Sequence, residues 1–186
     1  PKFTFGWNNN FHYKNWDLSV FINGSFGNKV GNYLAMKLTH MNSPWTNQTT
    51  DVKNRTILKP VNPGVSNWYD DVTNVVVANP GQVLPRATIN DPNDNDVWSS
   101  RYIEDGSYIR LKSISLSYTF DKKLISKIGL ENARINATAT NLFTITGYDG
   151  YDPEIGASTA SNNVFGLDNG RYPSPMSFSF GLGLTF

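Results

Sequence analysis

Few residues of this chain are of types that could do chemistry. The two imidazoles, His12 and His40, lie far apart in the sequence, and no cysteine is present to act as a nucleophile or a thiolate ligand. The sequence contains no Gly-x-Ser-x-Gly elbow, no P-loop and no His-x-x-x-His pair. We therefore expect no catalytic residue, no cofactor and no enzymatic activity.

The densest group of carboxylates lies in the stretch GYDGYDPE, residues 147–154. Asp149, Asp152 and Glu154, together with Asp168, carry the hard oxygen ligands that Ca²⁺ prefers. Their spacing does not match an EF-hand loop, and Asp side chains beside a proline commonly cap the backbone of a loop. We expect loop-capping hydrogen bonds here and no metal, with a calcium site as the alternative.

Four aromatic residues stand out in a long polar, Asn-rich stretch: Trp45, Trp68, Tyr69 and Trp98. Such side chains could stack on sugar rings or contact a partner protein, because Trp and Tyr are over-represented as interface anchors. The alternative is that they pack the stretch against the rest of the protein. In the same stretch, Val30, Leu34, Leu38 and Met41 have helical spacing and predict a short helix before Pro44.

These residues must be positioned by strands, because the rest of the chain alternates between apolar and small polar residues. Five segments show this period of two: residues 3–13, 16–25, 107–120, 133–145 and 176–186. Phe21 breaks the pattern of the second segment, and Asn141 and Leu142 break that of the fourth. In the third, Ile109 and Leu111 are out of phase with the residues that follow, which predicts a bulge near Lys112 and Ser113 or an end of the apolar zone.

The connections between these segments alternate between short and long. Lys14 and Asn15 form a tight turn and residues 121–132 a small cap, whereas residues 27–100 and 147–171 are long. Outer-membrane barrels have short periplasmic turns and long extracellular loops, and their strands need about 9–11 residues to span the membrane. This topology puts five aromatics at the periplasmic interface: Tyr13, Trp16, Tyr118, Phe120 and Phe186. A soluble β-sandwich remains the alternative reading of the periodicity.

The amino-acid composition excludes further classes of protein. With 39% hydrophobic and 17% charged residues and a net charge of +1, the chain is neither a disordered tail nor a nucleic-acid-binding protein. No apolar run has the 18 or so residues of a membrane helix, and no signal peptide opens the chain. An open sheet of five strands leaves unpaired edges, which hydrocarbon does not tolerate. We therefore expect this chain to be a fragment whose first residues already lie within a strand.

Three stretches resemble the C-terminal end of SusC/RagA-type TonB-dependent outer-membrane transporters: YIEDGSYIRLKSISLSYTF, ATNLFTITGYDGYDPEIG and GRYPSPMSFSFGLGLTF. The opening FTFGWNNNFHYKNWDLSVFINGSFGN resembles the hairpin that precedes them. The family ending, Tyr-Pro-x-Pro-Arg before an alternating strand that ends in Phe, is matched at Tyr172, Pro173, Pro175 and Phe186. Met176 stands where Arg is common.

The resemblance implies an all-β fold, in which these are the last five strands of an antiparallel transmembrane barrel of about 22 strands. It further implies a plug domain and a TonB-contacting segment in the missing N-terminal part, and a SusD-like surface lipoprotein as a lid. The expected function is TonB-dependent import of glycan or peptide oligomers across the outer membrane of a diderm bacterium. The expected partners also include outer-membrane lipid and the barrel assembly machinery, for which a terminal strand ending in Phe186 would be a recognition signal.

Two other functions fit the same patterns. One is a TonB-dependent siderophore or vitamin receptor that has no lid. The other is a soluble carbohydrate-binding β-domain, which the alternating strands and loop aromatics would also suit. The cargo cannot be derived from this sequence, because selectivity would also depend on a plug, other loops and a lid.

Overall fold

The structure, a computed structural model, describes residues 1–91, 93–155, 157–158 and 161–186, and only the backbone of residues 157–158 and 161–164. The chain divides into two compact units: Pro1–Gly31 with Ile103–Phe186, here called the sheet unit, and Asn32–Tyr102, here called the loop unit. Within the described residues, no helix has both the length and the apolar character needed to cross a membrane.

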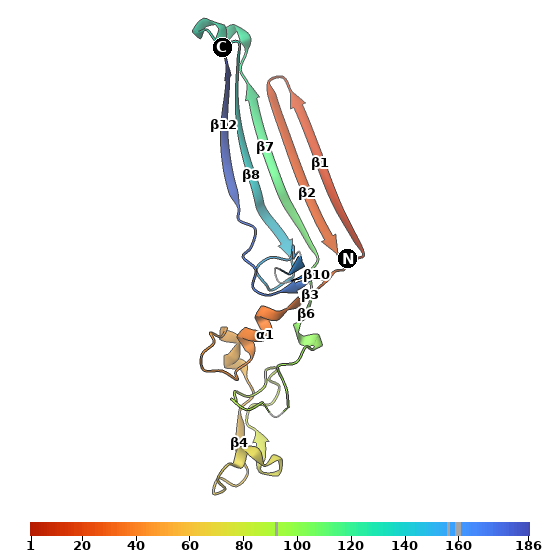
Figure 1. Cartoon of the computed structure of the whole chain (residues 1–186), viewed down its shortest axis with the longest axis vertical. Helices are drawn as coiled ribbons and strands as arrows, with labels where there is room; N and C mark the ends of the chain where they lie inside the picture. The colour runs from red at the N-terminus through yellow and green to blue at the C-terminus, as the bar shows by residue number, and fades with distance from the viewer. Residues whose placement is uncertain (92, 156, 159–160) are drawn as a thin grey trace. The chain divides into compact units, whose positions relative to one another are not determined.

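The elements follow one another in the chain as Figure 1 traces them. The sheet unit begins with β1 (Phe3–Tyr13), β2 (Trp16–Phe26) and β3 (Lys29–Asn32), of which only the last residue belongs to the loop unit. The loop unit holds α1 (Tyr33–Thr39), η1 (Thr50–Asn54), β4 (Leu58–Pro60), η2 (Trp68–Asp70), η3 (Val72–Asn74), β5 (Val75–Val77) and η4 (Ser100–Tyr102). The sheet unit continues with β6 (Ile103–Asp105), β7 (Tyr108–Thr119), α2 (Lys122–Ile125), η5 (Ser126–Ile128), β8 (Asn132–Thr146), β9 (Ala157–Ser158), β10 (Ser161–Phe165), β11 (Leu167–Asp168) and β12 (Ser177–Thr185).

The five long strands form one antiparallel sheet in the order β1-β2-β7-β8-β12 (Figure 1). They contain 11, 11, 12, 15 and 9 residues and correspond to the five alternating segments of the sequence. All-β antiparallel architecture is therefore confirmed. Each strand is long enough to cross a hydrocarbon layer when tilted, which takes about 9–11 residues.

One face of this sheet is apolar across all five strands. The registers align Phe11, Leu18, Leu116, Ala137 and Phe180 in one row. The register of a nearby row aligns Trp7, Ile22, Leu111 and Phe143. Because side chains alternate along a strand, every second row belongs to this face. The sheet thus has a continuous apolar surface of the kind that a lipid-facing wall requires.

A bulge keeps this surface continuous through β7. The pairing of β7 with β8 shifts between Leu111 and Ser113, and the pairing with β2 shifts at the same point. Lys112 is the extra residue, so Ile109 and Leu111 share the face of Leu116 although their sequence phase is opposite. On β8 the facing irregularity includes Asn141, which has a left-handed φ of 52°. The bulge predicted at Lys112 is confirmed.

The opposite face is polar. The register places Asn10, Ser19, Ser115, Thr138 and Ser179 in a single row. Ser115 and Thr138 are joined by a 2.8 Å hydrogen bond between their hydroxyls. Phe21 is the exception on this face, where its ring lies over Gly6. The two faces therefore differ in kind, as the alternation of the sequence predicts.

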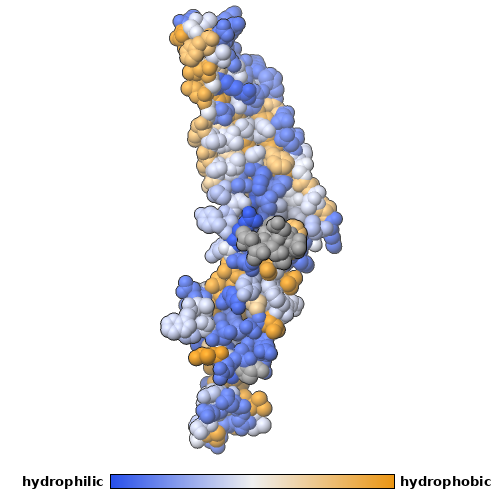
Figure 2. Space-filling model, in the orientation of Figure 1, coloured by the Kyte–Doolittle hydropathy of each residue, from blue (hydrophilic) through white to orange (hydrophobic). Residues whose placement is uncertain are grey.

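The apolar face is uncovered in the sheet unit. Phe180 is 83% exposed and Leu182 is 67% exposed. Proteins in water rarely leave contiguous apolar patches of this size uncovered. In the view of Figure 2, pale and blue residues dominate the visible face of the strands and orange ones gather at its margin. The uncovered side chains therefore need an apolar environment.

Short connections close one end of the sheet. A two-residue turn joins β1 to β2, where Lys14 adopts a left-handed φ of 54°. Between β7 and β8, α2 and η5 form a small cap in which Ile125 and Leu130 pack on Ala133 and Phe120. Aromatics gather at this end, where the rings of Trp16 and Tyr118 are 4.7 Å apart and those of Tyr118 and Phe120 are 5.1 Å apart.

The loop unit contains little regular structure. Its helix α1 starts at Tyr33, because Asn32 caps it by accepting the N–H of Ala35 at 2.8 Å. Val30, which the helical spacing includes, lies instead in β3. β4 and β5 form a small antiparallel hairpin. The predicted helix is thus present but shorter than the pattern.

Candidate functional site

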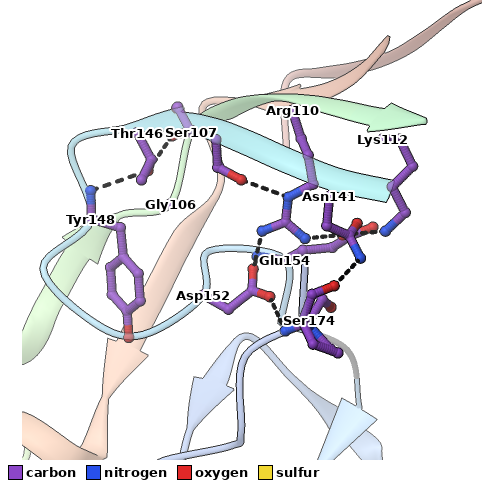
Figure 3. A network of polar contacts seen from close by, with 12 residues as sticks. Gly106, Ser107, Arg110, Lys112, Asn141, Thr146, Tyr148, Asp152, Glu154 and Ser174 are labelled. Carbon is purple, nitrogen blue, oxygen red and sulfur yellow. Dashed lines mark hydrogen bonds and ion pairs between the residues drawn. The ribbon is translucent and has the colours of Figure 1, made fainter. Parts of the chain in front are cut away.

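A buried arginine organises the polar side of the sheet unit beside the loop that follows β8. Arg110 is 3% exposed, and its guanidinium donates to Thr144 Oγ1 at 2.7 Å and to Glu154 Oε2 at 2.7 Å. It also donates to Asp152 Oδ1 at 2.5 Å (Figure 3). Lys112 Nζ lies 2.8 Å from the same Glu154 oxygen. These five residues are here called the Arg110 cluster.

The Arg110 cluster forms where β7 and β8 pair and where the loop that follows β8 folds back against them. Arg110 is paired with Thr144 across the sheet, which puts its side chain on the polar face. The loop turns back at Pro153, so that the carboxylates on either side of this proline face the same guanidinium (Figure 3). A planar guanidinium with several donors can bind two carboxylates at once, which a lysine cannot do with the same geometry.

Asp152 joins this loop to the segment that precedes β12. Its carboxylate accepts the N–H of Glu154 and the N–H of Ser174, each at 3.0 Å. Burial by itself would raise the pKa of Asp152. The hydrogen bonds from Arg110 and from the two backbone N–H groups outweigh that effect and hold the pKa of this carboxyl below its ordinary value.

A second buried pair lies close by. The hydroxyl of Tyr148 donates to Asp168 Oδ2 at 2.6 Å, and the two residues are 5% and 2% exposed. Burial, reinforced by the bond to Asp168, raises the pKa of Tyr148 well above its usual range. The other oxygen of Asp168 accepts the N–H groups of Gly170 at 2.8 Å and Arg171 at 3.3 Å. This carboxylate thus caps the loop that leads to β12.

A hollow of about 980 Å³ in the sheet unit is lined by Lys112, Asp152, Glu154 and Asp168 from these groups, together with Lys29, Tyr108 and Arg171. The three carboxylates in its wall, Asp152, Glu154 and Asp168, already accept hydrogen bonds from protein donors. Such carboxylates stabilise loop geometry and are poorly suited to act as a free general base. The hollow is therefore better suited to bind a ligand through its shape and its hydrogen-bonding groups than to catalyse a reaction.

Three of the four carboxylates considered for calcium bind protein donors, which are of different kinds. Asp152 and Glu154 share Arg110, whereas Asp168 binds Tyr148. At Asp149 the backbone N–H donates to Glu104 at 3.2 Å. Within the described ranges, no three His, Asp or Glu side chains are grouped so that they could hold a metal ion.

The two histidines lie in different units. His12 Nδ1 is 2.7 Å from Asp17 Oδ1, and the other oxygen of Asp17 accepts from Arg134 at 3.1 Å, on the polar face of the sheet. His40 is buried in the loop unit, where its Nε2 lies 3.4 Å from Asp91 Oδ2. Each imidazole thus has a carboxylate partner within its own unit.

The four loop aromatics lie in the loop unit, but only two of them meet. Trp68 and Tyr69 form an edge-to-face pair with ring centroids 5.8 Å apart. Trp98 packs instead against Tyr33 at 6.0 Å and Tyr102 at 6.5 Å, and Trp45 is 92% exposed. Contact of these residues with cargo or a lid stays a prediction. So does the assembly role of Phe186, which follows β12 and is 83% exposed.

Known proteins similar to this chain are TonB-dependent receptors. No protein-family model matches it. TonB-dependent receptor P3 of Formosa agariphila is 34% identical over 190 residues, which span 100% of this chain and 16% of the receptor. TonB-dependent receptor SusC of Bacteroides thetaiotaomicron is 34% identical over 93 residues, which span 49% of this chain and 8% of that receptor. The predicted resemblance to SusC/RagA-type TonB-dependent transporters is confirmed.

A solved structure has the same fold. The RagAB peptide importer in its closed-closed state matches with a TM-score of 0.67 at 19% identity, over 98% of this chain and 17% of the matched chain. At this sequence identity, the match shows that the two chains share a fold and nothing further. The chain spans 16% of the P3 receptor, so the similarity to TonB-dependent receptors concerns a segment of their length.

Within this SusC/RagA-like segment, the Arg110 cluster is the feature that sequence reasoning missed. A signal was present, because Arg110 and Lys112 are two charges in a strand otherwise built from Ser, Ile, Leu, Tyr and Thr. Their carboxylate partners lie 42 and 44 residues further along the chain, beyond the reach of any local pattern. Only the long-range pairing of β7 with β8 brings these groups together.

Proposed function

We propose that this chain forms part of the wall and mouth of a TonB-dependent outer-membrane transporter. The observation that carries the proposal is the sheet itself, with an apolar face that is continuous over five strands and a polar face opposite it. In a barrel wall, the apolar face lies against lipid and the polar face lines the lumen. Similarity to TonB-dependent receptors over the whole chain supports this reading.

The proposal requires the sheet to continue beyond this chain. β1 and β12 are edge strands here, and unpaired backbone groups cost several kcal/mol each in hydrocarbon. We propose a closed barrel of about 22 strands, of which these are the last five. The missing N-terminal part would carry the plug and the TonB-contacting segment, and the barrel assembly machinery would insert the protein into outer-membrane lipid.

The proposed orientation puts the short turns in the periplasm and residues 27–100 and 147–171 outside the cell. It can be tested by adding protease to intact cells. Cleavage is expected within the two long segments when the lid is absent, and the turn at Lys14 and the cap at residues 121–132 should be spared. Cleavage restricted to the turn and the cap would invert the topology.

The proposed activity is energised import of glycan or peptide oligomers together with a SusD-like lid lipoprotein. The proposal is supported by similarity in sequence to the TonB-dependent receptor SusC and by similarity in fold to the RagAB peptide importer. Because TonB would supply the energy from the inner membrane, we further propose that the protein is not an enzyme and needs no cofactor.

Uptake of labelled oligomers by cells tests this function. Removing the full-length protein, or TonB, should abolish uptake above the diffusive background, and restoring the gene should recover it. Uptake that persists without either protein would refute the proposal. Purification from native membranes should also retain a lipoprotein, and its absence would favour a siderophore or vitamin receptor without a lid.

A further inference from the structure

The loop unit contains a hollow whose wall combines two arginines with two aromatic rings. Its volume is about 340 Å³, and Arg55, Arg86, Trp68 and Tyr69 contribute to its lining. The remaining lining residues are Thr56, Ile57, Leu58 and Ala87. Among the described residues that line it, none is acidic, although the loop unit contains several aspartates. The charged side chains in the lining of this hollow are therefore all positive.

The two guanidiniums have spare hydrogen-bonding capacity. Arg55 makes a single side-chain hydrogen bond, from Nη1 to Val52 O at 3.3 Å. Arg86 has no hydrogen bond or ion pair to any described residue, although its side chain is half-buried. The contrast with Arg110 is clear, since that guanidinium binds two carboxylates and a hydroxyl. Half-buried arginines with unused N–H donors are suited to bind carboxylate or sulfate groups of a ligand.

The fold brings these residues together from three places in the sequence. Thr56 donates its N–H and its hydroxyl to Leu84 O at 2.9 and 2.8 Å, which aligns the backbone of Arg55 with that of Leu84. Arg86 follows two residues later. Trp68 and Tyr69 form η2 between β4 and β5, and these two strands pair as a hairpin. The arrangement is therefore set by backbone pairing.

The aromatic rings supply flat surfaces. Trp68 and Tyr69 are set edge to face with centroids 5.8 Å apart, and Tyr69 is 46% exposed. The negative face of an aromatic ring attracts the weakly positive C–H groups that cover one side of a sugar ring. A sugar ring that bears an anionic group could thus stack on an aromatic side chain and reach an arginine.

A second hollow adjoins the first and makes room for more than one ring. Its volume is about 530 Å³, and it shares Arg55 and Ala87 with the first. Apart from Arg55, its polar lining is neutral and consists of Asn42, Ser43, Thr46, Gln48 and Thr88. Side-chain amides and hydroxyls of this kind can donate to and accept from sugar hydroxyls. The two hollows together suit an oligomer whose charged group lies near Arg55.

We propose that these joined hollows bind an acidic sugar oligomer, carrying carboxylate or sulfate groups, as cargo of the proposed transporter. An acidic peptide fits less well, because bound peptides commonly pair with a free strand edge. Along this wall the N–H groups of Arg55, Thr56 and Ile57 are already bonded, to Val52, Leu84 and Asn79. The inference rests on the proposed import function and names its substrate class.

The test measures binding to the full-length protein in detergent by titration calorimetry. The probes are a tetragalacturonate, a sulfated galactan tetrasaccharide, neutral cellotetraose and tetraglutamate. At least one of the two acidic sugars should bind at least about tenfold more tightly than cellotetraose, and comparison of the two identifies carboxylate or sulfate as the preferred group. Equal affinity for cellotetraose, tighter binding of tetraglutamate, or no binding of either acidic sugar would overturn the inference.

Variants assign the binding to this site. Arg86→Gln should weaken acidic-sugar binding about tenfold, since it removes a charged hydrogen-bonding partner and breaks no bond to the described residues. Trp68→Leu should weaken binding of all sugars, charged or neutral. Lys59→Gln, an exposed residue outside both hollows, removes the same charge and should change affinity less than twofold. If Lys59→Gln and Arg86→Gln weakened acidic-sugar binding equally, the effect would come from the net charge of the protein, and the proposed binding site would be wrong.

Uptake measurements separate this inference from the proposed function. If cells import neutral oligomers through the protein but the purified protein does not bind acidic sugars, the substrate class is wrong and the transport function stands. If acidic sugars bind but neither they nor neutral oligomers are taken up, the transport function is wrong. Near-native circular dichroism of each variant is required for either conclusion.

Discussion

Replacing Arg110 by Met should release the loop of residues 147–155 from the sheet. Arg110 is 3% exposed, and its side chain makes three hydrogen bonds, two of them to carboxylates. Removing one partner of a buried ion pair costs about 3–5 kcal/mol, because a charge is left without compensation. Here Asp152 keeps two N–H donors and Glu154 keeps Lys112, so we expect the lower end, about 3 kcal/mol.

Hydrogen exchange in the full-length protein measures this loss locally. The N–H groups of Glu154 and Ser174, both bound to Asp152, should exchange about 100-fold faster in Arg110→Met, since 1.36 kcal/mol corresponds to a factor of ten. The N–H of Leu116, within β7, should be unchanged. Lys112→Met is the matched control, and as a side chain 33% exposed it should cost less than about 1 kcal/mol. Equal effects of the two variants, or unchanged exchange at Ser174, would refute the central role of Arg110.

Three further outcomes are expected. Leu182→Arg should destabilise a membrane-inserted barrel by about 2–4 kcal/mol in a lipid refolding assay, whereas Ser179→Arg on the polar face should cost clearly less; equal costs would contradict the two-faced sheet. Because the folded-state pKa of Asp152 is lowered, its stabilising effect is complete above its unfolded value of about 3.9 and is lost as the pH falls through the folded value. Pepsin should therefore cleave the 147–155 loop increasingly as the pH falls below about 4, and a constant cleavage rate would disagree. Deleting Phe186 from the full-length protein should reduce assembled barrel in the outer membrane far more than Phe180→Ala does, and equal reductions would leave Phe186 only a packing role.

The long strands could be predicted from sequence because period-two alternation is a local signal. Residues 3–13 alternate over a whole strand, and β1 has these same bounds. The phase change at Ile109 and Leu111 was readable for the same reason, since one extra residue in a ladder reverses the alternation. By contrast, β3, β4 and β5 have three or four residues each, too few for a period to be seen.

The site could not be predicted because its contacts join distant residues. Glu154 and Asp152 were recognised as carboxylates in a loop, but nothing local shows that their partner is Arg110 of β7. In the same way, Arg55 and Arg86 are 31 positions apart and line one hollow because Thr56 bonds to Leu84. The helical spacing that began at Val30 was misleading, since pairing with Glu104 holds this residue in β3.

The hydrogen bond from the N–H of Ser174 to Asp152 affects the register in which β12 pairs with β8. On its polar side β12 presents only small residues: Ser177, Ser179, Gly181, Gly183 and Thr185. A shift of β12 by two residues against β8 would move the strand by about 7 Å and leave its apolar and polar side chains on the same faces. The side-chain pattern therefore does little to prevent such a shift. The N–H of Ser174 lies 3.0 Å from a carboxylate that Arg110 of β7 holds in position, and such a shift would break this bond. Asp152 thus fixes the position of β12 along β8. A loop outside the sheet thereby selects one register among several that the side-chain pattern of β12 would allow.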